Sequence, residues 1–379
     1  MKKHFLIFAA LVATMTGCVK NEVMDVSDSG EISFDTYVGK HTRAVVINGR
    51  TDLSRFYVYG NMTNADDTEP ESVFNSEDVV WSGTSAQNGH YEYNGGVSTM
   101  WKADKKYYFA AVSNGNAAFR AEDVIAPEVF NPGDVVDFSY VYSETGDNQI
   151  TINDYTITDK DLIVDIADPI ETGESMVGKE TVTFDFRHIL TRVRFVINNG
   201  DAVGSNQIVA VQDLKFSGAK KGDCTYKLTA PNTHTISWGD FGSDAEYEYT
   251  VPIVDPAVNE EYVITPSSNK SFGHFVIPQS SEDKEVTFTL VTYHREGTPG
   301  NYTYTRTDSQ DYTFPLKYDN DNTAEVDYNW HPGKVYQYTV TLVGTTSYIR
   351  FDANVASWNF DINGDNSSNS ADDIPMTNN

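Results

Sequence analysis

The feature that most constrains this chain is a recurring alternation of apolar and polar residues with a period of two. Successive side chains of a β-strand point to opposite faces, so such a pattern is typical of strands that are half buried. Within 192–197, for example, Val193 and Phe195 alternate with Arg194. Similar β-branched and aromatic runs occupy 56–59, 107–112, 136–142, 162–166, 181–186, 208–216, 272–277, 286–293, 335–343 and 349–355. The pattern predicts an all-β fold made of antiparallel strands.

The length and the turn signals predict how these strands are grouped. A single hydrophobic core stops growing at about 250–300 residues, and this chain has 379. Turn pairs such as Asn199-Gly200 and Pro332-Gly333 separate the strands. The polar stretch 168–180 is the best candidate for a boundary. We therefore expect two β-sandwich domains in tandem, at 44–175 and 176–362, followed by a polar tail at 363–379 without regular structure.

The charge balance restricts the partners. The formal net charge is −28 and the pI is about 4.4. A field of this sign repels nucleic acid, so no nucleic-acid partner is expected.

The first residues read as an export signal. Lys2 and Lys3 precede an apolar run at 5–13, which is too short to span a membrane. The sequence Met15-Thr16-Gly17-Cys18 then resembles the bacterial lipoprotein box. The resemblance implies that 1–17 is a signal peptide and that the Cys18 sulfur carries lipid; the alternative is an ordinary signal peptide that contains Cys18. With Cys18 modified, Cys224 remains as a lone structural thiol.

No constellation of residues predicts an enzyme. The eight histidines are scattered, and neither a His-Glu-x-x-His motif nor a Gly-x-Ser-x-Gly elbow is present. We therefore expect no catalytic residue and no cofactor.

Two weaker patterns could indicate binding sites, one for calcium and one for a sugar. Near the end of the chain, acidic and amide residues follow a calcium-loop spacing at Asp361, Asn363, Asp365 and Asp372. No helix pattern flanks this stretch, so the favoured expectation is that no metal binds. Four tyrosines could offer a sugar-stacking platform or could pack in the core, which is the commoner role: Tyr91, Tyr93, Tyr107 and Tyr108.

Several segments together resemble the fimbrillin family, the type V pilins and Mfa-like fimbrial lipoproteins of anaerobic Gram-negative bacteria. Besides Cys18, they are Thr42-Arg43-Ala44 and the runs 56–60, 107–111, 186–195, 330–342 and 349–358. The resemblance implies two transthyretin-like sandwiches and export to the outer membrane as a lipoprotein. It also implies that a trypsin-like protease cuts after an arginine, and that the C-terminal strand of another subunit replaces the released N-terminal strand.

The chain contains candidates for each of these parts. Arg43, the first arginine, would be cut from Ala44, which makes 18–43 a tether with a removable strand. The residues expected to face the core in that strand are Ile32, Phe34, Thr36 and Val38. The candidate donor strand at 347–360 offers Ile349, Phe351, Ala353 and Val355. Both segments spell Ile-x-Phe-Asp-x-x-Val, although ordinary strands within one chain could share such a pattern by chance.

The sequence therefore predicts a structural subunit of a surface pilus that contributes to adhesion. Its expected partners are other pilus subunits, a trypsin-like maturation protease and the outer membrane through the lipid. The alternatives are a lipid-anchored surface protein that binds a glycan or host ligand, and a basal pilus anchor that is not cleaved.

Overall fold

The protein is described here from a computed structural model. The described residues are 30–38, 53, 55–85, 88–94, 99–113, 138–142, 148–158, 161–174, 181–199, 206–241, 247–250, 263–264, 270–298, 301–319, 326–343, 348–357, 373–375 and 377–378. All regular elements in these ranges are β-strands, which confirms the expected all-β class. None of these residues forms a helix long and apolar enough to cross a membrane.

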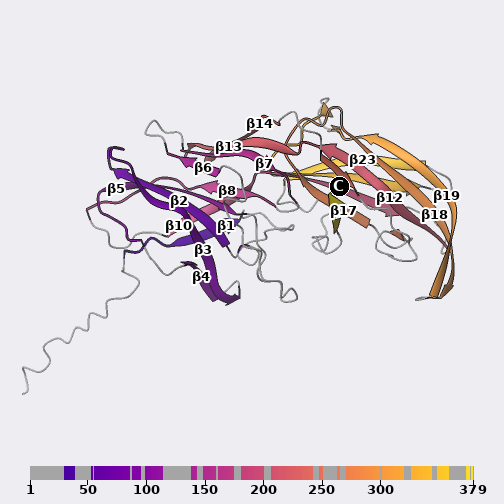
Figure 1. Ribbon diagram of the computed structural model, residues 1–379, viewed down its shortest axis with the longest axis horizontal. Helices are drawn as coiled ribbons and strands as arrows, with labels where there is room; N and C mark the ends of the chain where they lie inside the picture. The colour runs from indigo at the N-terminus through magenta and orange to yellow at the C-terminus, as the bar shows by residue number, and fades with distance from the viewer. Residues whose placement is uncertain are drawn as a thin grey trace, which may run out of the picture.

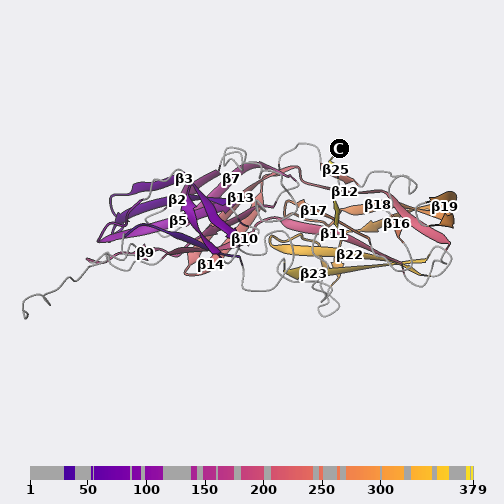
Figure 2. The ribbon, with the colours of Figure 1, turned by 90° about the horizontal axis from the view of Figure 1, so that it is seen from below.

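The molecule is elongated and has two lobes, and the two views agree on this shape (Figure 1, Figure 2). The first lobe contains a large sheet and a small one. The large sheet runs in the order β1 (Phe34–Val38), β10 (Val182–His188), β8 (Ile163–Ile166), β5 (Lys105–Ser113), β2 (Arg55–Asn64), β3 (Glu71–Ser85) and β4 (Asn88–Tyr93), with β9 (Ile170–Glu171) also on β5. The small sheet runs in the order β14 (Thr233–Gly239), β13 (Lys221–Ala230), β7 (Asn148–Thr156) and β6 (Phe138–Val141).

The large sheet buries apolar side chains on both faces. Val164 and Ile166 pack with Tyr226 of the small sheet. On the opposite face, Phe34 of β1 and Tyr91 of β4 belong to one cluster. Because β1 and β4 are the two edges of the sheet, this shared core requires the sheet to curl until its edges approach each other.

The second lobe is a sandwich of two sheets. One runs in the order β23 (Tyr348–Ser357), β22 (Lys334–Val343), β11 (Thr191–Asn199), β17 (Lys270–Val276) and β24 (Asp373–Pro375). The other runs in the order β19 (Asn301–Pro315), β18 (Glu285–Thr298), β12 (Gln207–Gly218), β15 (Tyr247–Thr250) and β25 (Thr377–Asn378), with β16 (Val263–Ile264) on β12. Strands β20 (Tyr318–Asp319) and β21 (Val326–Asp327) form a separate two-stranded ribbon, and β20 contacts β23. Phe195 and Phe288 from opposite sheets meet in one core, with Trp330.

The lobes do not divide at residue 175, where the sequence placed a boundary. Strand β10 follows that position but pairs with β8, and β13 pairs with β7. The chain therefore enters the second lobe at β11, returns for β13 and β14, and leaves again. The polar stretch at 168–180 marked a loop, because turn residues report exposure and not which strands pair. The expected tail also contributes two short strands, β24 and β25.

Candidate functional site

The N-terminal segment forms an edge strand whose inner face is buried. Strand β1 runs parallel to β10, with Phe34 opposite Val182 and the register continuing to residue 38. Ile32, Phe34 and Thr36 are 0, 5 and 3% exposed. Their spacing of two places all three on the core face, as the alternation predicted. The side chain of Val38, the fourth predicted position, lies outside the described residues.

Phe34 lies in a socket made of five aromatic rings. Its ring stacks on Phe184 at 6.0 Å between centroids, with 22° between the ring planes. Phe56, Phe74, Tyr93 and Phe109 surround it at 5.5–6.4 Å, all edge to face. Pairs of this geometry add to the gain from burial, because ring edges are positive and ring faces negative. Loss of β1 would therefore uncover an apolar socket that is ready for another aromatic side chain.

Polar contacts hold the same segment to β4 and to the turn before β5. The Tyr93 hydroxyl donates a hydrogen bond to the Ile32 carbonyl. The Ile32 amide donates to the Thr99 carbonyl at 2.8 Å. The Thr36 hydroxyl donates to the Tyr91 oxygen at 3.0 Å. Burial, and then the charge of nearby Glu31, raise the pKa of Tyr93, so this phenol stays protonated and remains a donor.

A pocket of about 550 Å³ lies along the side of this segment that faces β4. Its lining comes from β1, the residues just before it, and β3 and β4: Glu31, Ile32, Ser33, Phe34, Val80, His90, Tyr91, Glu92, Tyr93 and Asn94. Within the described residues, β1 forms a strand ladder only with β10. Release of β1 would therefore break one strand ladder among the described residues.

The C-terminal candidate is also an edge strand. Strand β23 pairs antiparallel with β22, with Phe351 opposite Val340. Phe351 stacks on Phe314 at 4.5 Å and is only half-buried. Ala353 and Val355 pack against the same core and are also half-buried, while the side chain of Ile349 lies outside the described residues. The two predicted segments thus share edge positions and a similar alternation, with Ala353 where the first has Thr36.

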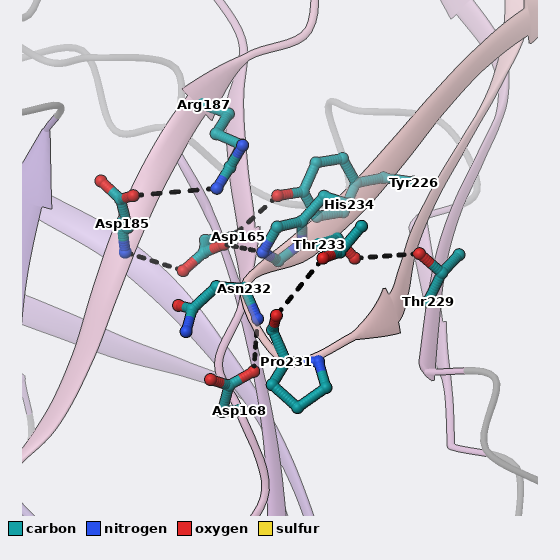
Figure 3. Close-up of polar contacts among 10 residues, drawn as sticks. All are labelled: Asp165, Asp168, Asp185, Arg187, Tyr226, Thr229, Pro231, Asn232, Thr233 and His234. Atoms are coloured by element: carbon teal, nitrogen blue, oxygen red, sulfur yellow. Dashed lines mark hydrogen bonds and ion pairs between the residues drawn. The ribbon is translucent and has the colours of Figure 1, made fainter.

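A buried carboxyl group lies between β10 and the small sheet (Figure 3). Asp165 accepts hydrogen bonds from the Asp185 amide at 2.7 Å and the Tyr226 hydroxyl at 3.2 Å. Burial raises the pKa of Asp165 to about 7. The imidazole of His234 lies 3.9 Å from the same carboxyl, but burial lowers the pKa of His234 to about 4. The contact at neutral pH is therefore between Asp165 of β8 and a neutral ring of β14. The hydrogen bond from the Asp185 amide ties the same carboxyl to β10, with which β1 pairs.

The other sequence candidates divide into two groups. Outside the described residues lie Cys18, Arg43, Ala44, Asp361, Asn363, Asp365 and Asp372. The four tyrosines that could offer a sugar-stacking platform are core residues instead: Tyr91, Tyr107 and Tyr108 are at most 5% exposed, and Tyr93 is half-buried over Phe34. Among the described residues, no group of three or more histidine, cysteine or acidic side chains could hold a metal ion.

Sequence reasoning missed the residues that receive β1. The alternation placed Phe184 in a strand, but no local signal shows that this strand pairs with residues 34–38. Tyr93 and Phe74 come from a different part of the chain, and only the curl of the sheet brings them to Phe34. Asp165 was missed as well, because a single aspartate in an apolar run gives no sign of its burial.

Comparison with known proteins agrees with this architecture. The family model described as fimbrillin-like matches residues 42–358. The chain belongs to the fimbrillin-like family. A fimbrial protein from Bacteroides vulgatus ATCC 8482 is similar to this fimbrillin-like chain, with a TM-score of 0.51 and 14% identity over 86% of this chain and 99% of that protein. The tip fimbrial protein Mfa3 from Porphyromonas gingivalis, solved with a C-terminal truncation, has a TM-score of 0.35 and 9% identity over 86% and 100%.

No curated protein matches this fimbrillin-like chain. At 14% identity, the similarity to the Bacteroides vulgatus protein shows a shared fold and does not assign a role to any residue.

Proposed function

We propose that this protein is a structural subunit of a cell-surface pilus that assembles by strand replacement. In this proposal the chain is exported as a lipoprotein through Cys18 and is cleaved between Arg43 and Ala44. The released N-terminal segment takes β1 with it. The observation that carries the proposal is the seat of β1, an edge strand whose Phe34 fills an aromatic socket beside an open pocket. Membership of the fimbrillin-like family supports a role in a pilus.

The donor that fits the vacated seat best is β23 of another copy. Phe351 takes the place of Phe34 in the aromatic socket. Ile349 and Val355 take the places of Ile32 and Val38, and Ala353 takes the place of Thr36. Backbone hydrogen bonds to β10 supply affinity, and the alternate side chains supply specificity. An edge left open would otherwise be exposed to uncontrolled pairing.

The proposed assembly requires other pilus subunits, a trypsin-like maturation protease and attachment to the outer membrane through the lipid. It involves no catalytic step and no cofactor of this chain. The subunit contributes to adhesion as part of the fibre.

Limited proteolysis tests the proposal. Residues 19–379 would be treated with an arginine-specific protease, then followed by N-terminal sequencing, heated gels and electron microscopy. We expect a new N-terminus at Ala44, together with filaments and heat-stable ladders. The variant Arg43→Gln should stay intact there and remain unassembled. Clean cleavage at Ala44 without any assembly would contradict the proposal.

The second candidate is a lipid-anchored binding protein or basal anchor that keeps β1. The hydrogen bonds from Tyr93 and Thr36 that retain the segment favour it. Protein isolated from its host separates the two candidates, because an N-terminus at Ala44 indicates the pilus subunit and a lipidated Cys18 indicates the anchor.

A further inference from the structure

One hairpin extends beyond the sheet that supports it. Strands β18 and β19 pair along their whole length, from Glu285–Pro315 to Thr298–Asn301. The last ladder pair between β18 and β12 joins Gln207 to His294, and the Arg295 amide then donates to the Asn206 carbonyl at 2.8 Å. Within the part of the chain that the structure describes, the rest of the tip has no ladder partner on the β18 side. Figure 1 shows the two strands at the end of the second lobe that is farthest from β5.

One face of this tip carries only arginine, tyrosine and glycine. The register places Tyr293 opposite Arg306 and Arg295 opposite Tyr304, so all four point to the same side. The guanidinium of Arg295 lies 4.4 Å from the ring centroid of Tyr302. Tyr302 in turn meets Tyr304 edge to face at 6.2 Å. We call this set, Tyr293, Arg295, Tyr302, Tyr304 and Arg306, the arginine–tyrosine face.

The composition of this face marks it as a contact surface. Arginine and tyrosine are the residues most enriched where protein interfaces concentrate their binding energy. Arg306 is exposed, and the other four side chains are half exposed. In a chain of net charge −28, a face with two arginines and no acidic residue differs sharply from the average surface.

The opposite end of the molecule carries the complementary charge. Ser113 and His188 both lie opposite Ile163, which places the end of β5 beside the entry to the second lobe. The start of β5, the end of β2 and β9 therefore lie at the far end of the first lobe (Figure 2). Six exposed acidic residues gather in the turns and at the strand ends there: Asp66, Glu69, Glu71, Asp104, Glu171 and Glu174. We call this set the acidic turns.

Lysines near the acidic turns do not cancel this charge. Lys106 pairs with Asp67 at 3.0 Å. Lys102 lies 3.2 Å from Glu71, and both side chains are more than half exposed. Lys105, the third lysine among the described residues at this end, donates to Asn64 at 2.5 Å. The end of the first lobe therefore keeps an acidic excess.

We propose that the arginine–tyrosine face of one copy docks on the acidic turns of a second copy. The two surfaces lie at opposite ends of an elongated molecule, so their contact is head to tail and can repeat without closing. Complementary charge steers such an encounter and fixes its register, which matters for subunits that otherwise repel one another. The inference rests on the proposed pilus function, which needs a repeating contact, but it uses residues outside β1 and β23.

A second copy fits this face better than a sugar does. Sugar-binding platforms present an open ring face. Here Arg295 covers one face of Tyr302, and Tyr304 lies against it edge to face. The Arg295 guanidinium over the Tyr302 ring and the exposed guanidinium of Arg306 instead suit the carboxylates of a protein surface.

Charge reversal in the uncleaved protein tests the proposal. Residues 18–379 with Cys18→Ser, which retain β1, would be studied by sedimentation velocity at low and high salt. The tip variant carries Arg295→Glu and Arg306→Glu, and the turn variant carries Glu171→Lys and Glu174→Lys. A control with Lys215→Glu and Lys317→Glu has the same net charge as the tip variant but leaves both surfaces intact.

We expect weak, salt-sensitive self-association that each variant weakens at least tenfold, whereas the control retains it. An equal mixture of the two variants should recover association, because the unaltered face of the turn variant then meets the unaltered turns of the tip variant, and the two reversed surfaces are also complementary in charge. Unchanged association in both variants overturns the proposal, and so does equal loss in the control. A protein that stays monomeric yet binds heparin through Arg295 and Arg306 overturns the assignment of the partner. Heat-stable gel ladders formed by the cleaved tip variant would show that strand replacement does not depend on this contact.

Discussion

Phe34 and Phe184 stack on each other across the ladder that joins β1 to β10. Phe184 belongs to β10 and remains in the molecule, whereas Phe34 belongs to the segment that we propose is removed. The contact thus has a permanent member and a replaceable one. Its strength decides both how firmly β1 is held and how strongly an empty seat attracts another aromatic side chain.

Truncation of Phe34 should weaken the uncleaved protein and spare the assembled one. Phe34→Ala removes a ring that is 5% exposed, so we expect a loss of about 3–5 kcal/mol in the free energy of unfolding of the first lobe. Denaturant unfolding of uncleaved protein measures it, with Ser33→Ala, an exposed neighbour, as the control. Filaments of cleaved protein lack this residue, and their stability should not change; an equal loss there would show that β1 is retained.

Truncation of the donor side chain should have the reverse effect. Phe351 is half-buried in its own lobe, so Phe351→Ala should cost the monomer only about 1–2 kcal/mol. In a filament the same ring would fill the fully buried socket of Phe34, and we expect heat-stable ladders to be lost. Asn354→Ala, at an exposed position of the same strand, is the control. If the Phe351→Ala protein forms ladders as heat-stable as those of wild type, Phe351 does not fill the socket of Phe34.

The stability of the first lobe should depend on the protonation of Asp165. Its pKa is raised from 3.8 to about 7 in the folded protein, so folding binds a proton between these values. The contribution of Asp165 is thus favourable below about pH 4, declines as the pH rises to about 7, and by then has cost up to about 4 kcal/mol. Asp165→Asn should gain stability over wild type at pH 8 and little at pH 4. Asp154→Asn, an exposed control, should show no such pH-dependent difference.

Close packing beside the socket predicts a contrast between two glycines. A Cβ atom at Gly60 would lie 2.8 Å from a ring carbon of Phe74 and 3.0 Å from one of Phe109. Gly60→Ala should therefore destabilise the first lobe by about 1–3 kcal/mol. At Gly173 nothing lies within 4 Å of the new atom, so Gly173→Ala should be nearly neutral. Thermal unfolding of both variants measures the contrast, and equal melting temperatures would contradict this packing.

Local pattern predicted the strands but not their partners. The period of two placed Ile32, Phe34 and Thr36 on one face, because that property depends only on neighbouring residues. It could not show that Phe34 meets Tyr93 and Phe184, since the pairing of distant strands depends on the whole sheet. The same limit explains why the polar stretch near residue 175 predicts a domain boundary, although β13 returns to the first lobe.

The features of the site that could be predicted are therefore those that depend on a single continuous segment. The shared pattern of residues 32–38 and 349–355 was visible in the sequence, and the socket that gives it meaning was not. The arginine–tyrosine face shows the same limit, because Arg295 and Tyr304 face each other only through the register of a hairpin.

The most direct test of strand replacement is a disulfide between copies at the predicted register. If Phe351 takes the place of Phe34 beside Val182, residue 352 of the donor lies opposite residue 183 of the acceptor, as Asp35 does in the intact chain. Burial raises the pKa of the Cys224 thiol, which keeps it from competing. Protein with Thr183→Cys and Asp352→Cys, in the Cys18→Ser background, should form a covalent ladder after cleavage at Arg43 and none before it. Filaments that form without this cross-link would contradict the account.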